Sequence, residues 1–352
     1  MTSPADPSVQ VTSTVRTPFA ASIAAVPPAL VVSSSGWACT KRTVRALSGL
    51  VTGSTVRRCG DHDVAALLFA AMSGLRSTTE LIQSSRNASL AINHFGGSGS
   101  PLIVSHATGF HAHCYQPMMA ILTQNFEVWG LDYAGHGASA APADRDYHWA
   151  LFAQDLLDAL DHLGVAHVSV FGHSMGGAAA LLAEKQRPGT VTAAFLYEPI
   201  IFPPEIVPRN SMMAEAASNR RREFDSKAEA LLRYASRPPL NTMRADALAA
   251  YVNHGFITTK AGTVTLACAP ETEAATFNNA GTSVEDIRGL QPRTTIAFGE
   301  SITEPNPAQF AGPAAEALAD AVLKSYEGLG HFGPLQDPER IARDVVEFFT
   351  QP

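Results

Sequence analysis

From about residue 78 onward, short apolar runs alternate with longer segments whose apolar residues repeat with the period of a helix. Seven runs rich in Val, Ile, Leu and Phe are predicted to be strands: 88–95, 101–107, 127–133, 167–172, 192–197, 294–298 and 323–326. The segment before residue 88 is a candidate for one more. Four segments are predicted to be helices: 149–163, 175–186, 314–322 and 338–349. Strands that alternate with helices build a mostly parallel sheet flanked by helices, so the pattern predicts an α/β fold.

The alternation stops between residues 202 and 288, where Ala-, Glu- and Arg-rich helical segments are broken at 237–239 and 253–255. We therefore expect residues 78–201 and 289–352 to form the core domain and residues 202–288 to form a helical lid. An insertion of this size is expected to fold as a separate lobe. If it lies over the carboxyl ends of the strands, it would shape a substrate pocket.

The N-terminal segment differs from the rest of the chain. Residues 1–60 are rich in Ser, Thr, Ala, Val and Pro and contain one acid, Asp6, against six Lys or Arg residues. Such a composition cannot drive a packed core. Residues 1–77 are therefore predicted to be a disordered leader or a mistranslated upstream region. An organelle transit peptide and a true start at Met72 both fit this composition.

Charge, hydropathy and cysteine usage exclude several classes of protein. The formal net charge is −7 and no long Lys/Arg run occurs, so no nucleic-acid partner is expected. The longest apolar run, residues 64–72, is too short to span a bilayer, so no stable membrane insertion is expected. The four cysteines are scattered without metal-type spacing, which favours the reducing cytoplasm unless the leader directs import into an organelle. The oligomeric state stays open.

The most specific motif is GHSMG at residues 172–176, between a predicted strand and a predicted helix. A nucleophile elbow needs a serine on a strained strand-to-helix turn, with glycines two residues before and after it. Ser174 is therefore the candidate nucleophile. The Met175 amide lies at the start of the helix, where it can face an oxyanion.

Two further motifs lie at the ends of other predicted strands. The sequence HATGF at residues 106–110 comes immediately after strand residues 101–105, at the point where a second oxyanion-hole amide is expected, and we choose the Thr108 amide. The sequence GLGHFG at residues 328–333 follows the last strand and places His331 as the candidate general base. The pair His111 and His113 has no evident third ligand, so no metal site is expected.

Taken together, residues 88–350 resemble the α/β-hydrolase superfamily. Four features occur in the order of that family: HATGF at 106–110, DYAGHGAS at 132–139, the elbow, and GHF at 330–332. The resemblance implies the α/β-hydrolase fold and a serine hydrolase that needs no cofactor. The chain departs from the family at Ala107, where a glycine is usual, and at Ala134, where an arginine is usual.

The third member of the catalytic triad is missing from its usual place. The family acid, three residues beyond Gly299, is replaced by Ile302. Glu198, at the carboxyl end of the strand after the nucleophile helix, stands where some haloalkane dehalogenases carry their acid. A carboxylate there could accept the imidazole N–H and hold the tautomer of the base. Glu300 and Glu304 are the alternatives.

These residues predict acyl transfer to Ser174 from a small-molecule ester or related carbonyl substrate that carries an apolar group. Hydrolysis of a C–C bond beside a ketone and perhydrolase-like chemistry use the same residues and stay open. A non-catalytic ligand-binding member of the fold is the alternative from another class. Outside the site, Asp132 and His136 are expected to hold a turn, and the run 220–222, three arginines, is expected on a solvated helix face.

Overall fold

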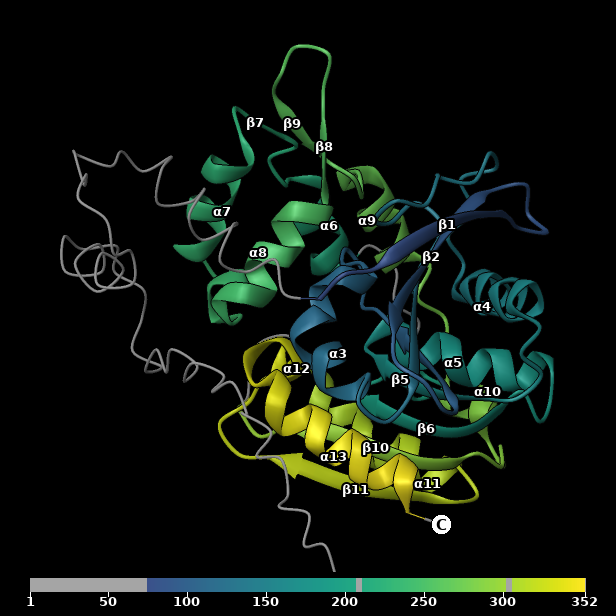
Figure 1. Cartoon of the computed structure of the whole chain (residues 1–352). Helices are drawn as coiled ribbons and strands as arrows, with labels where there is room; N and C mark the ends of the chain where they lie inside the picture. The colour runs from purple at the N-terminus through teal and green to yellow at the C-terminus, as the bar shows by residue number, and fades with distance from the viewer. Residues whose placement is uncertain (1–74, 207–210, 302–305, 352) are drawn as a thin grey trace, which may run out of the picture. The chain divides into compact units, whose positions relative to one another are not determined.

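The computed structural model describes residues 75–206, 211–301 and 306–351. Nearly all of the predicted leader, residues 1–77, thus lies outside the described residues. The centre of the molecule is an eight-stranded sheet with the order β1-β2-β4-β3-β5-β6-β10-β11 (Figure 1). The strands are β1 (Thr78–Gln83), β2 (Ser89–Gly96), β3 (Pro101–Ser105), β4 (Glu127–Asp132), β5 (Val168–His173), β6 (Val191–Tyr197), β10 (Arg293–Gly299) and β11 (Ala321–Tyr326).

The sheet confirms the predicted fold. β2 pairs antiparallel with both β1 and β4, and the pairs from β4 through β3, β5, β6 and β10 to β11 are parallel. Each of the seven predicted strands corresponds to a strand of this sheet, and β1 is the eighth. Because β3, β5, β6, β10 and β11 are parallel, their carboxyl ends meet at one edge of the sheet.

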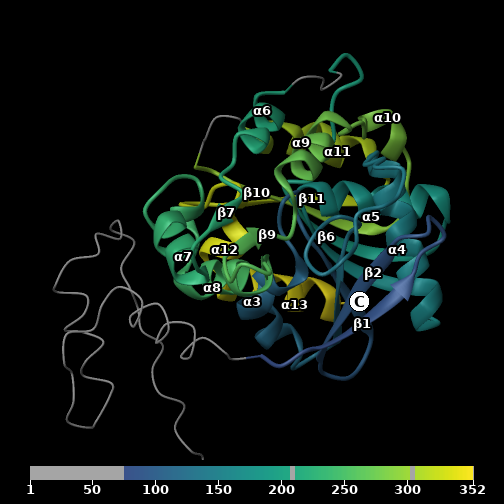
Figure 2. The ribbon, with the colours of Figure 1, turned by 90° about the horizontal axis from the view of Figure 1, so that it is seen from above.

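Helices cover both faces of the sheet (Figure 2). One face carries α4 (Trp149–Leu163), α5 (Met175–Gln186), α10 (Val284–Ile287) and α11 (Ala311–Ala317). The other carries η1 (Ala112–Tyr115), α3 (Gln116–Leu122), α12 (Gly333–Gln336) and α13 (Pro338–Thr350). Among the described residues, no helix is long and apolar enough to cross a membrane.

Two apolar cores follow from this layering, because successive strand side chains point to opposite faces. Val170 of β5 and Leu196 of β6 belong to the core beneath α4 and α5. Their neighbours in sequence, Phe171 and Phe195, belong to the core beneath α3 and α13. Strands buried on both faces are apolar almost throughout, which is why these strands could be predicted from continuous apolar runs in the sequence.

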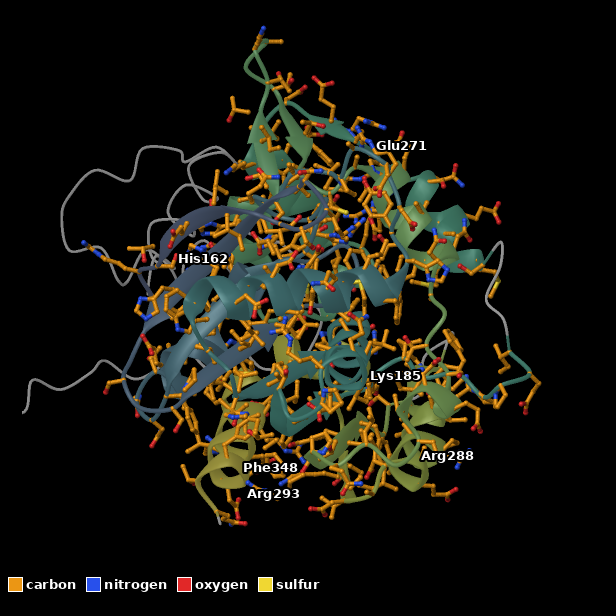
Figure 3. All side chains as sticks on the ribbon, turned by 90° about the vertical axis from the view of Figure 1, so that its right-hand side faces the viewer. His162, Lys185, Glu271, Arg288, Arg293 and Phe348 are labelled. Carbon is orange, nitrogen blue, oxygen red and sulfur yellow. The ribbon has the colours of Figure 1, made fainter. Side chains whose placement is uncertain are left out.

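The helices agree with the predictions at α4, α5 and α13, but the predicted helix 314–322 was wrong at its end. The helix stops at Ala317, and Ala321 begins β11, where it pairs with Thr294 of β10. Pairing with β10 takes priority over the alanine-rich helical pattern. At the same end of β10, the Arg293 guanidinium lies over the ring of Phe348 in α13 and donates to the Phe348 carbonyl (Figure 3).

The insertion, residues 202–288, contains helices and a small antiparallel sheet of order β7-β9-β8. Besides α10 it contains α6 (Met212–Ser218), β7 (Glu223–Phe224), α7 (Lys227–Ala235), η2 (Leu240–Thr242), α8 (Ala245–His254), β8 (Phe256–Thr258), β9 (Val264–Leu266) and α9 (Pro270–Asn278). That residues 202–288 form a lobe of their own stays a prediction. Leu248 and Val252 of α8 share one apolar cluster with Phe110 and Met118 of the core, because α8 packs on η1.

Candidate active site

The candidate residues come from four loops at one edge of the sheet. Thr108 follows β3, Ser174 follows β5, Glu198 follows β6, and His331 lies in the loop between β11 and α12. Because these strands are parallel and adjacent or nearly adjacent in the sheet, their loops gather over the same edge. The topology thus brings together residues that are up to 223 positions apart in the chain.

Ser174 occupies a strained turn between β5 and α5. Its φ is 56° and its ψ is −119°, a region that residues with a Cβ rarely adopt. The neighbouring glycines are required by close packing. A Cβ on Gly172 would lie 2.7 Å from Gly177 Cα, and one on Gly176 would lie 2.3 Å from the Ser105 carbonyl oxygen. The motif therefore has a geometric reason at each of its small positions.

The same packing brings the start of α5 against the end of β3. The Gly176 carbonyl accepts a hydrogen bond from Ser105 Oγ at 2.9 Å. Within the described ranges, neither the Thr108 amide nor the Met175 amide donates to an intramolecular acceptor. Two backbone N–H groups on neighbouring loops are therefore available for a developing negative charge, and the 12-residue helix α5 adds its positive end.

Glu198 and His331 are in direct contact. Glu198 Oε2 lies 2.6 Å from His331 Nδ1, and Glu198 Oε1 accepts from the Gly299 amide at 2.8 Å. The glutamate is 2% exposed, whereas the histidine side chain is 22% exposed. Because a carboxylate accepts, Nδ1 carries the proton, which leaves the lone pair of Nε2 free to act as a base.

The other carboxylates considered for this role differ in their surroundings. Glu300, which follows Gly299, is exposed. Ile302 and Glu304 lie outside the described residues. The usual family acid is thus absent at residue 302. The carboxylate next to His331 is instead that of Glu198, which the Gly299 amide holds at the end of the neighbouring strand β10.

The turn after β4 is held by Asp132, as its sequence position suggested. Its two carboxylate oxygens accept from the amides of Ala112 and Ala138 at 2.8 and 2.9 Å. Burial raises the pKa of Asp132 to about 6. His136 Nδ1 lies 3.2 Å from the Ala134 carbonyl, and burial lowers its pKa to about 4. These groups therefore hold the turn after β4 and attach it to the start of η1.

The pair His111 and His113 takes part in separate contacts. His111 Nε2 bonds the Tyr251 carbonyl at 3.1 Å, and His113 Nε2 lies 3.0 Å from Ser77 Oγ. In the part of the chain that the structure describes, no group of three His, Cys, Asp or Glu side chains is arranged to hold a metal ion.

Arg220 was wrongly expected on a solvated helix face. It lies in the loop after α6, its side chain is 19% exposed, and it pairs with Glu273 of α9. Its guanidinium also donates to Tyr251 Oη at 2.6 Å. A Cβ on Gly109 would lie 2.6 Å from Glu273 Oε1, so this pair rests against the loop that carries Thr108. No local pattern in the sequence connects these positions.

Aromatic rings of the insertion and the core meet beside the candidate residues. The Phe110 ring lies 5.5 Å from that of Phe332 and 5.3 Å from that of Tyr251, centroid to centroid. Phe332 is the neighbour of His331, and Tyr251 belongs to α8. The loops after β3 and β11 therefore meet the insertion through an apolar contact.

Comparison with known proteins agrees with the fold. The family model described as "Alpha/beta hydrolase family" matches residues 102–344. An uncharacterized protein of Mycobacterium tuberculosis is 29% identical over 273 residues, which cover 72% of this chain and 76% of the relative. The monoglyceride lipase of Homo sapiens is 32% identical over 114 residues, which cover 30% of this chain and 37% of the lipase.

Solved structures show the same fold. The crystal structure of E-2-(acetamidomethylene)succinate hydrolase is similar with a TM-score of 0.66 and 20% sequence identity, and the match covers 78% of this chain and 100% of that one. The family model alone spans more than half of the chain. The chain therefore belongs to the alpha/beta hydrolase family.

Proposed function

We propose that the protein is a serine hydrolase in which Ser174, His331 and Glu198 form the catalytic triad. The contact between Glu198 Oε2 and His331 Nδ1 carries this proposal, because it leaves His331 Nε2 as the basic atom. The strained conformation of Ser174 supports its role as the nucleophile. The amides of Thr108 and Met175 would form the oxyanion hole.

The reaction would proceed by acyl transfer in two steps. Ser174 Oγ attacks the substrate carbonyl carbon while His331 Nε2 takes the hydroxyl proton. The oxyanion accepts hydrogen bonds from the two amides, and collapse of the intermediate expels the leaving group, which receives the proton from His331. Water then attacks the acyl-enzyme with the same base, and the acid product leaves Ser174 free.

We propose an ester or a related carbonyl compound with an apolar group as the substrate. The cluster of the Phe110, Phe332 and Tyr251 rings beside His331 supports this choice, because apolar groups next to the reacting atoms favour apolar ligands. We also propose that residues 202–288 act as the lid, since α8 and α9 contact the loop after β3 through Tyr251 and Glu273.

The proposal is tested by labelling the purified chain with a fluorophosphonate probe. The wild type should label at Ser174, as peptide mass analysis would detect. Ser174→Ala should abolish labelling, and His331→Ala should slow it by about 10³-fold or more. His162→Ala is the matched control, since His162 is an exposed histidine on α4 and its loss should leave the labelling rate unchanged (Figure 3).

A wild type that never labels, and that hydrolyses no p-nitrophenyl ester, would contradict the proposal and favour a ligand-binding member of the fold. Labelling at another residue would contradict the choice of nucleophile. C–C bond hydrolysis on the same residues would appear as labelling of Ser174 without ester turnover, and perhydrolase-like activity as peracid formed from the ester when hydrogen peroxide is added.

A cytoplasmic location stays a prediction. Cys114 and Cys268 are buried free thiols in the described part of the chain. Burial raises the pKa of both thiols well above the ordinary value, so they are held as unreactive thiols.

A further inference from the structure

Behind the candidate site, buried groups form one line of hydrogen bonds. The Ala107 amide donates to Tyr115 Oη over 3.2 Å. Tyr115 Oη lies 2.7 Å from His173 Nδ1, and His173 Nε2 lies 2.8 Å from the carbonyl oxygen of His331. The side chains of Tyr115 and His173 are 0% exposed. We call this line the Tyr115–His173 chain.

Donors and acceptors fix the direction of the chain. A carbonyl oxygen only accepts, so His173 Nε2 carries the proton and Nδ1 accepts from the Tyr115 hydroxyl. Burial and the nearby His331 lower the pKa of His173 well below its ordinary value, and burial raises the pKa of Tyr115. The imidazole and the phenol therefore stay neutral, as this pattern of donors requires.

Each end of the chain lies next to a proposed catalytic group. Ala107 precedes Thr108, His173 precedes Ser174, and the last acceptor is the backbone of His331 itself. The three loops follow β3, β5 and β11, which are not all neighbours in the sheet. β3 and β5 pair directly, but β11 pairs with β10 and with neither of them, so the Tyr115–His173 chain connects the base loop to the elbow where the sheet does not.

The loop that carries His331 has a second anchor. Tyr197, the residue before Glu198, donates through its hydroxyl to the Gly330 carbonyl at 2.9 Å. Two consecutive carbonyls, those of Gly330 and His331, are thus bound from β6 and from the elbow. With Glu198 holding Nδ1 of the ring, the direction of His331 Nε2 depends on where these contacts place its backbone.

We propose that Tyr115 and His173 are positioning residues, which hold the base loop and the oxyanion loop in register with Ser174. This inference rests on the proposed function. Neither residue exchanges protons with substrate; each acts through the backbone that it binds. Because reacting groups must meet within narrow limits, a displacement of about 1 Å can cost about 10²-fold in rate.

Two substitutions of His173 separate the two hydrogen bonds of its ring, the one to the His331 carbonyl and the one from Tyr115. The carboxamide nitrogen of Gln lies about where Nε2 lies, so His173→Gln can keep the bond to the His331 carbonyl. The carboxamide oxygen of Asn lies about where Nδ1 lies, so His173→Asn can keep only the bond from Tyr115. Tyr115→Phe removes the hydroxyl and leaves the His331 contact in place.

Hydrolysis of p-nitrophenyl butyrate measures the effect. We expect His173→Asn to lower kcat by about 10- to 100-fold with KM within about threefold of wild type. His173→Gln should recover most of that loss, and Tyr115→Phe should fall between them. Tyr147→Phe is the control, since Tyr147 is a buried tyrosine whose hydroxyl contacts Thr272 Oγ1 at 3.2 Å outside the chain.

The control should lose stability without losing kcat. If the chain variants lower kcat only in proportion to a loss of Tm, or if His173→Gln is no better than His173→Asn, the positioning role is overturned. Nitrogen-15 NMR of labelled histidines gives a readout independent of activity. His173 should show the neutral Nε2–H tautomer from pH 5.5 to 8, and another tautomer would overturn the chain.

The two proposals fail in different ways. A wild type that neither labels nor hydrolyses ester contradicts the proposed function and the positioning role together, whatever the NMR spectrum shows. An active wild type whose kcat is insensitive to His173→Asn overturns the positioning role alone.

Discussion

The core and the insertion are held by different kinds of contact. In the core, the loops of the site are joined by neutral hydrogen bonds of buried groups, such as those of Tyr115 and Tyr197. The insertion instead carries ion pairs: Arg220–Glu273, Arg221–Glu229 and Arg222–Glu271 lie within it, and Arg244–Glu339 joins it to α13. The loops of the core are therefore joined by directional bonds, whereas the insertion is cross-linked internally by ion pairs and packs on the core through the apolar cluster of α8.

This difference has a functional meaning. Hydrogen bonds between buried neutral groups are directional and leave little freedom to the groups that they join. Exposed ion pairs tolerate more movement and contribute little stability. We therefore expect the loops of the candidate site to be held more rigidly than the ion-paired surface of the insertion. The following predictions can break this contrast or sharpen it.

The largest effect is expected in the core at Glu198. Glu198→Gln replaces the acceptor of the His331 Nδ1 proton by an amide, which can stabilise the wrong tautomer, so kcat should fall by about 10³- to 10⁴-fold. Glu300→Gln, the control at the exposed neighbouring acid, should leave kcat unchanged. Steady-state hydrolysis of p-nitrophenyl butyrate checks both, and the opposite ranking would move the acid to Glu300.

The core should also lose stability in acid. Five buried histidines have pKa values lowered by burial: His106, His111, His113, His136 and His173. The unfolded chain binds protons on these groups below about pH 6.5, whereas the folded chain does not, so their contribution is lost as the pH falls.

Two buried carboxyls act in the opposite direction. Burial raises the pKa of Asp132 to about 6 and that of Asp155 to about 7, so the folded state binds more protons there and gains stability as the pH falls. Five histidines outweigh two carboxyls. Urea unfolding should show a free energy of unfolding lower at pH 5 than at pH 7 by on the order of 5 kcal/mol. A flat profile would mean that the histidines titrate normally.

In the insertion, the largest effect is expected at the buried pair. Arg220→Met leaves the Glu273 carboxylate unpaired beside Gly109, which should lower the free energy of unfolding by about 3 kcal/mol. Adding Glu273→Gln should restore part of the loss. Thermal unfolding of the single and double variants measures the coupling, and an additive result would show that the two side chains do not interact.

The smallest effect is expected at the exposed pair of the same run. Arg222 and Glu271 have side chains 49% and 70% exposed, so Arg222→Ala should change the free energy of unfolding by less than about 1 kcal/mol. Glu271 lies at the outer surface of the insertion (Figure 3). A loss as large as that of Arg220→Met would mean that the whole run is structural.

Much of the core could be predicted from the sequence because its signals are local. A strand buried on both faces needs a continuous apolar run, and the turn at Ser174 needs small residues at fixed positions. Both β5 and the elbow can therefore be recognised from the local sequence alone. The helix α11 was placed too far along the chain because pairing with β10 decides its end.

Only the tertiary structure decided which groups meet across long separations. The sequence determined the α/β fold and left Glu198, Glu300 and Glu304 as candidate acids. The parallel pairing of β6 with β10 places Glu198 where it accepts a hydrogen bond from the Gly299 amide and contacts His331. Likewise, Arg220 stands in the same arginine run as the exposed Arg222, so nothing in the local sequence distinguishes the two side chains. The burial of Arg220 depends on Glu273 and Tyr251, and a contact between such distant positions leaves no periodic trace in the chain.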